Sequence, residues 1–488
     1  MKLLAGREKP SCTASDDQQP TTHLVTNNRL ASILGGLEAT RNRLLSLRKQ
    51  AFSLAFAHGT EIVQPLLVFL YAGRVFTPVS FGQFAYAMAI SQIATTAVDY
   101  GFFWTAQRAA ASSHREPAMI ASLLADVVTT KAAVFIIVAV AGYAASGNLL
   151  AMSKPMFLAC MLTSLGNVIF ASWLFIALER AWQFAIGMVL ARAVALAAFV
   201  TFVRSPADVL IAVAIQASIP LIAGILTVPF IIPIGLQGFR KVTPGRVVAQ
   251  LRSGWRGFLY TLVDRAVASL PVPFVEHFGG FIAAGQYSIA EKFIAAVRPF
   301  FSLMLNTFQP RVAHYSRVDP AAGFALISSA LVTLVVGVAL SLLLFFVAPY
   351  LIILLFGESF AGAVPIVRTM AVLPILININ VCTSSLYMFN YGHERAWAHL
   401  TVIGMLVFIA SAYVLCLTLT NAGVAVTLGV IARECTVLSV SASFFIAFGI
   451  RNTKVARNRG ARATWPNTGG AEPALVSPTG ATESDSRP

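Results

Sequence analysis

Charged residues are scarce in this sequence. They make up 11% of its 488 residues, whereas 57% are hydrophobic, and the mean hydropathy is +0.76. Soluble globular domains carry roughly 25% charged residues, so this scarcity excludes an ordinary soluble protein. A chain that is both this apolar and this long is expected to cross a membrane many times.

The sequence also lacks the signatures of disulfide scaffolds, metal centres and common enzymes. Motifs of the types GxxxxGK(S/T), HExxH and GxSxG are missing, and the loops between apolar runs are short, so we expect neither an enzyme nor a cofactor. The first long apolar run begins near Ala51, too late for a cleavable signal peptide. No disulfide framework or metal site is expected, because the five cysteines have no paired spacing: Cys12, Cys160, Cys382, Cys416 and Cys435.

Apolar runs of about 20 residues, the length that crosses a bilayer, predict an all-α polytopic protein with about twelve membrane helices. The ninth run is too long for one straight span, so part of it is expected to leave the membrane near Tyr350. Charged residues and prolines interrupt the seventh. The runs lie near 51–72, 81–103, 118–145, 156–178, 184–203, 209–234, 257–276, 283–308, 323–355, 362–389, 397–419 and 423–448.

Basic residues are distributed unequally between the two sets of loops. Because cytoplasmic loops carry an excess of arginine and lysine, the richer set is predicted to be cytoplasmic, together with both termini. The net charge of +15 thus reflects membrane orientation rather than nucleic acid binding. The poorer set holds Arg74, Lys154, Arg204 and Arg368, and the richer set holds Arg108, Arg115, Arg180, Arg240, Lys241, Arg246, Arg252, Arg256, Arg311, Arg317 and Arg395.

The spans and the composition divide the chain into five segments. Within the cytoplasmic N-terminal tail, leucines and basic residues mix over 30–49, which fits either a helix on the anionic inner leaflet or a solvated leader. The C-terminal tail is expected to be cytoplasmic and disordered. The segments are a tail over 1–49, a six-helix bundle over 50–235, a basic cytoplasmic linker over 236–256, a second six-helix bundle over 257–448 and a tail over 449–488.

Two short matches indicate that the bundles are repeats. The tetrapeptide ERAW occurs at 179–182 and at 394–397, each time in the cytoplasmic turn before a span. FGQFAYA (81–87) resembles AGQYSIA (284–290), and each glycine, Gly82 or Gly285, precedes an arginine by 26 residues. The offsets of 215 and 203 residues require an insertion of about twelve, which the long ninth span can hold. Such repeats are related by an axis along the membrane normal, around a central cavity.

Charged side chains inside the spans are the candidate functional residues. An intramembrane cation costs roughly 2.5–3.5 kcal/mol on insertion scales, so it is expected either to be paired or to serve transport. Glu291 and Arg298 lie two helical turns apart and share a face. Cations on several helices around one cavity would hold a large anion such as a pyrophosphate, which arginine forks match. The alternative for each charge is a buried structural ion pair.

These charges fall into two predicted groups. The cations are predicted to contact the anionic head group of a cargo. The carboxylates are predicted to be counter-charges, or sites of proton or cation coupling. The cations are Lys131, Arg192, Arg265, Lys292 and Arg298, and the carboxylates are Glu61, Asp126, Asp264 and Glu291.

Several stretches resemble the Wzx-type flippases of polysaccharide biosynthesis. The segment RVFTPVSFGQFAYAMAISQIATTAVDYGFFWTAQRAAA (74–111) is similar to their signature region, with an FG pair, a DYG triplet and a trailing arginine. WLFIALER (173–180) resembles the family's WxFxGxE, although Ala177 replaces the usual glycine. GQYSIAEKF (285–293) and LLFGESF (354–360) also match, so the resemblance covers about 50–450.

The resemblance implies a multidrug/oligosaccharidyl-lipid/polysaccharide transporter fold in a bacterial inner membrane. The implied cargo is a polyprenyl-pyrophosphate-linked oligosaccharide, flipped for O-antigen, exopolysaccharide or capsule synthesis. Membrane lipids are expected partners, and a polysaccharide polymerase with its chain-length machinery is a further candidate.

Three alternatives stay open. A cation-coupled exporter of small molecules would use the same fold, with acidic and aromatic cavities. A membrane enzyme would need a longer outer loop, and a scaffold of an assembly complex would transport nothing.

Overall fold

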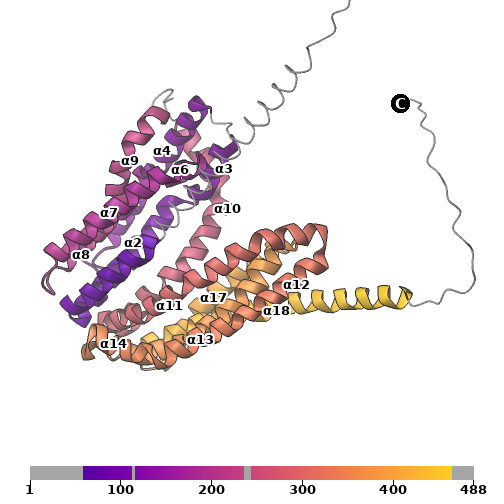
Figure 1. Ribbon diagram of the computed structural model, residues 1–488. Coiled ribbons are helices and arrows are strands. Elements are labelled where there is room, and N and C mark those ends of the chain that lie inside the picture. Colours follow the sequence, from indigo (N-terminus) through magenta and orange to yellow (C-terminus); the bar gives the residue numbers. More distant parts are fainter. Residues whose placement is uncertain (1–58, 113–115, 236–242, 464–488) are drawn as a thin grey trace, which may run out of the picture. The chain divides into compact units, whose positions relative to one another are not determined.

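The computed structural model describes residues 59–112, 116–235 and 243–463, and these residues are almost entirely helical (Figure 1). Within them, the one isolated β-bridge joins Ser146 and Leu150. Nine segments of the described chain are long and apolar enough to cross a membrane. One of the nine, Thr261–Val318, covers most of predicted span seven and all of predicted span eight. The predicted second span, 81–103, is not among the nine, and the predicted first span is described only from residue 59. The count of twelve therefore stays a prediction.

The N-terminal part of the described chain follows the predicted spans closely. A helix over 59–75 comes first. The helices that follow are α2 (Pro78–Asp99), α3 (Phe102–Ser112), α4 (Pro117–Ala145), α5 (Lys154–Ile169), α6 (Ser172–Ala177), α7 (Ala181–Phe202), α8 (Val209–Ala217) and α9 (Ile219–Gly235).

The C-terminal part contains longer helices and more interruptions. It consists of α10 (Pro244–Ser269), α11 (Pro271–Val318), α12 (Pro320–Ala330), the 3-10 turn η1 (Leu331–Thr333), α13 (Leu334–Phe346), α14 (Ala348–Phe356), the 3-10 turn η2 (Glu358–Phe360), α15 (Ala363–Met370), α16 (Leu373–Asn380), the π-helix η3 (Val381–Met388), α17 (Glu394–Thr418) and α18 (Ala422–Ala463).

Local sequence explains where several of these helices begin and end. At the start of α2 the Thr77 hydroxyl accepts a hydrogen bond from the backbone N–H of Ser80, at 3.3 Å, and proline follows as the first helical residue. A hydroxyl N-cap followed by proline is a strong start signal. Gly280 interrupts α11 with φ of 73°, between the predicted spans seven and eight. The ninth run is divided into α12, η1, α13 and α14, and Tyr350 is an exposed residue of α14. Whether the chain leaves the membrane there stays a prediction.

The predicted tails and linker are covered only in part. Residues 1–58, including the proposed interfacial segment, lie outside the described residues, as do 464–488. From Pro244 onward the predicted linker is helix α10. The last helix, α18, continues to Ala463, so it ends later than the boundary predicted at 448.

The chain packs into two compact units, each containing residues distant in sequence. Unit 1 comprises the described residues up to Ala296, together with Leu343–Met370 and Ala410–Gly429. Unit 2 comprises Val297–Leu342, Ala371–Ile409 and the chain from Val430 onward. These units are defined by contacts and combine separate segments, whereas the predicted bundles are continuous in sequence. The division into two six-helix bundles therefore stays a prediction.

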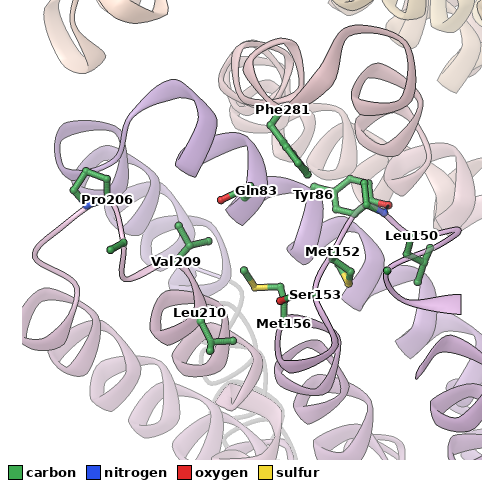
Figure 2. A pocket seen from close by; sticks show the side chains of 13 residues that line it. Gln83, Tyr86, Leu150, Met152, Ser153, Met156, Pro206, Val209, Leu210 and Phe281 are labelled. Carbon is green, nitrogen blue, oxygen red and sulfur yellow. Dashed lines mark hydrogen bonds between the residues drawn. The ribbon is translucent and has the colours of Figure 1, made fainter. Parts of the chain in front are cut away.

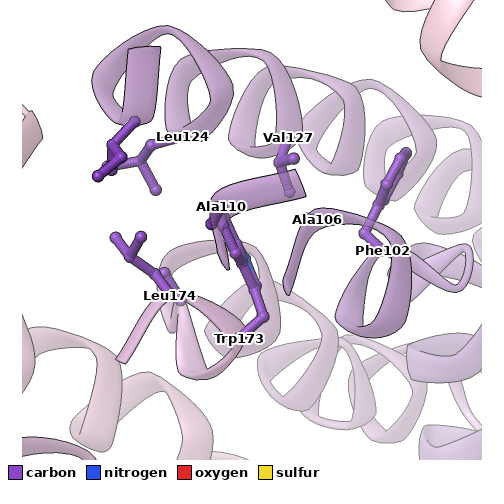
Figure 3. Close-up of a cluster of buried hydrophobic side chains, with 9 residues drawn as sticks. Phe102, Ala106, Ala110, Leu124, Val127, Trp173 and Leu174 are labelled. Atoms are coloured by element: carbon purple, nitrogen blue, oxygen red, sulfur yellow. The ribbon is translucent and has the colours of Figure 1, made fainter. Parts of the chain in front are cut away.

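Inside unit 1, α5 is the central helix and packs against α2, α4, α8 and α9. A buried apolar cluster joins α3, α4 and α6 (Figure 3). Trp173, in α6, extends toward Ala110 in this cluster and is 2% exposed. The tryptophan of the WLFIALER stretch is therefore a packing residue that holds the short helix α6 against the bundle. In unit 2, a second cluster gathers around Tyr387 and Met304.

The first ERAW turn ends α6 with a recognisable cap. The backbone N–H of Arg180 donates to the carbonyl of Phe175 at 2.8 Å. Glu179 adopts the left-handed conformation, with φ of 58°. This is the Schellman motif, in which glycine usually holds the left-handed position.

The second ERAW turn has the same cap, but two residues earlier relative to the tetrapeptide. The N–H of His393 donates to the carbonyl of Met388 at 3.0 Å, and Gly392 has φ of 80°. The structural counterpart of Glu179 is thus Gly392 rather than Glu394. The first tetrapeptide runs from the cap into the start of α7, whereas the second lies wholly in the first turn of α17, so the two copies differ in register. Superposition of the two halves stays a prediction.

Candidate functional site

Lys131 of α4 is buried in unit 1 and paired with Asp99. Its side chain is 3% exposed, and the ammonium lies 2.6 Å from the Asp99 carboxylate. The Asn167 carbonyl also accepts from this ammonium at 3.5 Å, and the Asn167 amide donates to the same aspartate oxygen. Burial of a cation requires such a partner. The sequence pointed to Asp99 only through the DYG triplet and gave no sign of its partner.

Asp126, one of the predicted counter-charges, joins α4 to α10. Its carboxylate forms an ion pair with the Arg246 guanidinium, which also donates to the Ser122 hydroxyl at 2.9 Å. The other Asp126 oxygen is buried without a hydrogen-bond partner among the described residues. The partner cation comes from the predicted linker, not from a membrane span. Asp126 therefore ties the start of α10 to α4 inside unit 1.

Arg192 and Glu61 lie near one another, as a predicted cation and a predicted counter-charge. The Arg192 guanidinium is 3.9 Å from the Glu61 carboxylate and donates to the Thr60 hydroxyl at 2.8 Å. The arginine side chain is 12% exposed and the glutamate 60%. The pair links α7 to the helix over 59–75. Its screening by solvent on the glutamate side makes it a weaker link than a buried pair.

Lys292 of α11 has an aromatic partner instead of a carboxylate. Its ammonium lies 4.3 Å from the centroid of the Phe69 ring, within cation–π range. The ring is buried, and the lysine is half-buried. Among the described residues, no carboxylate forms an ion pair with Lys292.

The remaining predicted charges lie on α10 and α11. Arg265 and Arg298 are exposed, and neither forms an ion pair with a described residue. Glu291 is half-buried. The side chain of Asp264 is outside the described part of the structure. The five predicted cations thus separate into two that form ion pairs, Lys131 and Arg192, and three that form none with any described residue.

Unit 2 contains a buried polar cluster whose contacts the sequence did not predict. The Asn380 amide donates to the Glu434 carboxylate at 2.6 Å and to the Glu434 carbonyl at 3.1 Å. Arg433 pairs with the other carboxylate oxygen. Asn380 directly precedes the π-helix η3, a local irregularity that is frequent at functional sites. An asparagine inside an apolar span was the available signal, but it did not identify the partner helix.

A cavity of about 590 Å³ opens in unit 1 beside the start of α2 (Figure 2). Gln83 and Tyr86 of α2 face it, together with Ser153, Pro206 and Phe281. None of the predicted charged residues lines it. Its lining offers an amide, a phenol and a hydroxyl among apolar side chains, the composition typical of a small-molecule pocket.

The loop that borders this cavity is fixed by Asp208. Its carboxylate accepts hydrogen bonds from the backbone N–H groups of Arg204, at 3.0 Å, and Ser205, at 2.8 Å. These bonds, with one from the Ser205 hydroxyl, hold the pKa of Asp208 below its ordinary value. The loop is therefore pre-organised at neutral pH, when the carboxylate is charged.

Known proteins show which family the sequence resembles. Residues 47–316 match the family described as "Polysaccharide biosynthesis protein". A protein of Escherichia coli (strain K12) named "Putative O-antigen transporter" is 24% identical over 416 residues, covering 84% of this chain and 98% of its own. A protein of the same name from Shigella dysenteriae is 20% identical over 376 residues, covering 75% and 92%.

Solved structures share the fold at low sequence identity. An inward-facing multidrug resistance MATE family transporter of the MOP superfamily has a TM-score of 0.63 at 12% identity, covering 84% of this chain and 99% of its own. The MATE multidrug transporter DinF-BH in complex with R6G has a TM-score of 0.51 at 12% identity, covering 81% and 94%. These likenesses confirm the predicted all-helical transporter fold.

Proposed function

The chain belongs to the family of polysaccharide biosynthesis proteins, and from this premise we propose that it flips a polyprenyl-pyrophosphate-linked oligosaccharide across a bacterial inner membrane. The relatives named as O-antigen transporters support a surface polysaccharide unit as the cargo. The multi-pass helical chain supports a membrane protein, and the names of the relatives support a transporter. The positive-inside pattern further supports cytoplasmic termini.

One observation carries the proposal: three cations within predicted spans have no carboxylate partner among the described residues. Arg265, Lys292 and Arg298 lie on α10 and α11, and each would be costly in a membrane protein without an anionic ligand. A pyrophosphate supplies that anion, and the guanidinium groups can bind it through two parallel hydrogen bonds. We therefore assign the head-group contacts first to these three residues.

Lys131 and Arg192, the two cations that form ion pairs, are weaker candidates for contact with the head group. Lys131 and Arg192 could reach a head group only by leaving Asp99 and Glu61, respectively. For the carboxylates, Glu61 and Asp126 act as counter-charges, to Arg192 and Arg246. Glu291, near the unpaired cations along α11, is the better candidate for proton or cation coupling. Asp264 keeps the same two candidate roles.

The chemistry of the cargo explains why transport needs a protein. A charged sugar diphosphate cannot enter hydrocarbon, whereas its polyprenyl tail is stable there. Alternating access by two helix bundles would pass the head group through a cationic cavity while the tail stays in lipid. The cation-coupled exporter of small molecules is the alternative. The fold it would use is the one shared with the multidrug transporters.

Reconstituted vesicles test the proposal directly. Labelled lipid-linked oligosaccharide is placed in both leaflets, and an impermeant enzyme that destroys exposed glycan reports how much becomes accessible over time. The wild-type protein should accelerate exchange at least tenfold over empty vesicles, and Arg298→Ala should not. Exchange equal to that of empty vesicles, from a folded wild-type protein, would contradict the proposal. Export of a cationic dye under the same conditions would favour the alternative.

A further inference from the structure

Two glycines make a direct backbone crossing between α2 and α11 inside unit 1. A Cβ atom on Gly82 would overlap the carbonyl oxygen of Phe281, and one on Gly285 would lie 2.8 Å from the carbonyl oxygen of Pro78. The obstructing atoms belong to the backbone, so no side-chain rotation could relieve either clash. Glycine at both positions allows the two helices to approach this closely.

The crossing is reciprocal. Pro78 precedes Gly82 by four residues, and Phe281 precedes Gly285 by the same four. Each segment thus offers a carbonyl oxygen to the glycine of the other, as in an isologous contact about a two-fold axis. The two segments are those matched by the internal repeat, FGQFAYA and AGQYSIA. The repeat is therefore in register at this contact, although it is not in register at the ERAW turns.

Aromatic side chains close the space around the crossing. Phe81, which is fully buried, packs edge-on against Phe360 at 5.4 Å and Phe356 at 6.4 Å between ring centroids. Gln286 lies against Gly362, where an added Cβ would meet its side-chain amide oxygen at 2.5 Å. The contact is densely packed. It joins the start of α2 to three later segments of unit 1: α11, α14 and η2.

We propose that this crossing is the outer seal of the transport pathway, and we call it the glycine seam (Pro78–Gly82 with Phe281–Gly285). The proposal rests on the proposed function, because a seal requires a pathway. All its members lie at the ends of spans that the arginine distribution predicts to be outer. Phe281 also lines the cavity beside α2, so separation of the seam would widen that cavity toward the cargo's exit side.

The physics of the seam suits a contact that must open and close. Contacts between glycine Cα–H groups and carbonyl oxygens are worth only about 0.5–1 kcal/mol each, so the backbone crossing itself adds little to the cost of separation. With no side chain to swing aside, opening has to occur by movement of the two helices as bodies. Gly280, with φ of 73° immediately before Phe281, is a residue able to absorb such a movement.

A cysteine placed in the seam reports its state. Ala284 is fully buried beside Gly285, and Ala284→Cys is made in the full chain in oriented vesicles. Labelling by an impermeant maleimide is measured from each side, against a parent without the reporter to subtract the native cysteines. Adding Gly82→Ala should prevent closure, raise outside labelling at least threefold and lower transport at least tenfold. The matched control is Gly245→Ala, because a Cβ there meets nothing within 4 Å.

The outcomes separate the seal from the proposed cargo. Unchanged labelling and normal transport in both Gly82→Ala and the milder Gly285→Ala would overturn the seal, as would labelling that rises only from the cytoplasmic side. If the Gly82→Ala variant fails to insert into the membrane, the result for Gly285→Ala alone tests the seal. Increased outside labelling supports the seal even if wild-type protein moves no lipid-linked oligosaccharide, because the labelling needs no cargo. In that case only the proposed function fails.

Discussion

The ammonium of Lys131 lies 2.6 Å from the carboxylate of Asp99, so a predicted cargo contact is neutralised inside unit 1. Removing one member of a buried pair leaves an uncompensated charge, at a cost of about 3–5 kcal/mol. Asp99→Asn alone should therefore lower the thermal stability of the purified protein strongly. The double variant Asp99→Asn, Lys131→Met should recover most of that loss, because neither charge is left unpaired.

Transport by the same double variant distinguishes the two roles of Lys131. If the lysine only stabilises the bundle, the stable double variant should transport normally. A stable but inactive double variant would instead place Lys131 in the head-group site. The readouts are thermal unfolding in detergent and exchange in vesicles, measured on one preparation.

The left-handed conformation of Glu179 makes a second prediction, about stability. A non-glycine residue in this conformation costs roughly 1–2 kcal/mol of folding free energy. Glycine avoids this strain, but it offsets part of the gain because it loses more conformational entropy on folding. Glu179→Gly should therefore stabilise the protein by about 0.5–1 kcal/mol. Thermal unfolding measures the change.

The other ERAW glutamate provides a matched control of opposite sign. Glu394 is the first residue of α17 and has a helical conformation, so Glu394→Gly should destabilise by about 0.5–1 kcal/mol. Equal shifts of the same sign would contradict the two-residue difference in register between the turns.

The sequence predicted most of the span positions because each needs only a long apolar run. The break near Tyr350 and the interruption at Pro271 were also readable, since excess length and proline are local signals. The early start of α10 at Pro244 could not be predicted from the sequence. That segment is rich in arginine and resembled a linker, and it is held by the distant contact from Arg246 to Asp126.

Pairings within the site were the harder part. Sequence identified Lys131 as an intramembrane charge, but its partner Asp99 lies 32 residues away on another helix. Asn380 and Glu434 are 54 residues apart. Such partners depend on which helix faces meet, and one sequence does not determine that. The glycine repeat was visible as a pattern, whereas its meaning as a backbone crossing required the packing.

The orientation of the chain is a third prediction. The arginine distribution places Lys154 outside and Arg252 inside. Both side chains are exposed, so Lys154→Cys and Arg252→Cys should each react with an impermeant maleimide, from opposite sides of intact cells and inverted vesicles. Labelling from the same side would overturn the predicted topology. Arg252 is preferred to Arg246 because the latter is paired with Asp126.

The last prediction concerns Arg298, which is exposed on α11 and forms no ion pair with a described residue. If it binds a pyrophosphate, Arg298→Ala removes a charged hydrogen bond worth about 1.5–3 kcal/mol. Transport should then fall at least about tenfold, since 1.4 kcal/mol corresponds to a factor of ten. Arg298→Lys should recover only part of it, because an ammonium cannot reproduce the two parallel bonds.

Two variants make this result specific. Arg317→Ala removes another exposed arginine from the last turn of α11 and should leave transport near wild type. The double variant Glu291→Gln, Arg298→Gln tests whether the arginine serves only to neutralise the glutamate on its own face. If it does, and if Glu291→Gln alone keeps transport and so has no coupling role, the double variant has no uncompensated charge and should transport normally. A head-group contact predicts that this double variant stays inactive while its thermal stability and membrane level match the wild type, because the cargo's diphosphate still lacks its donor.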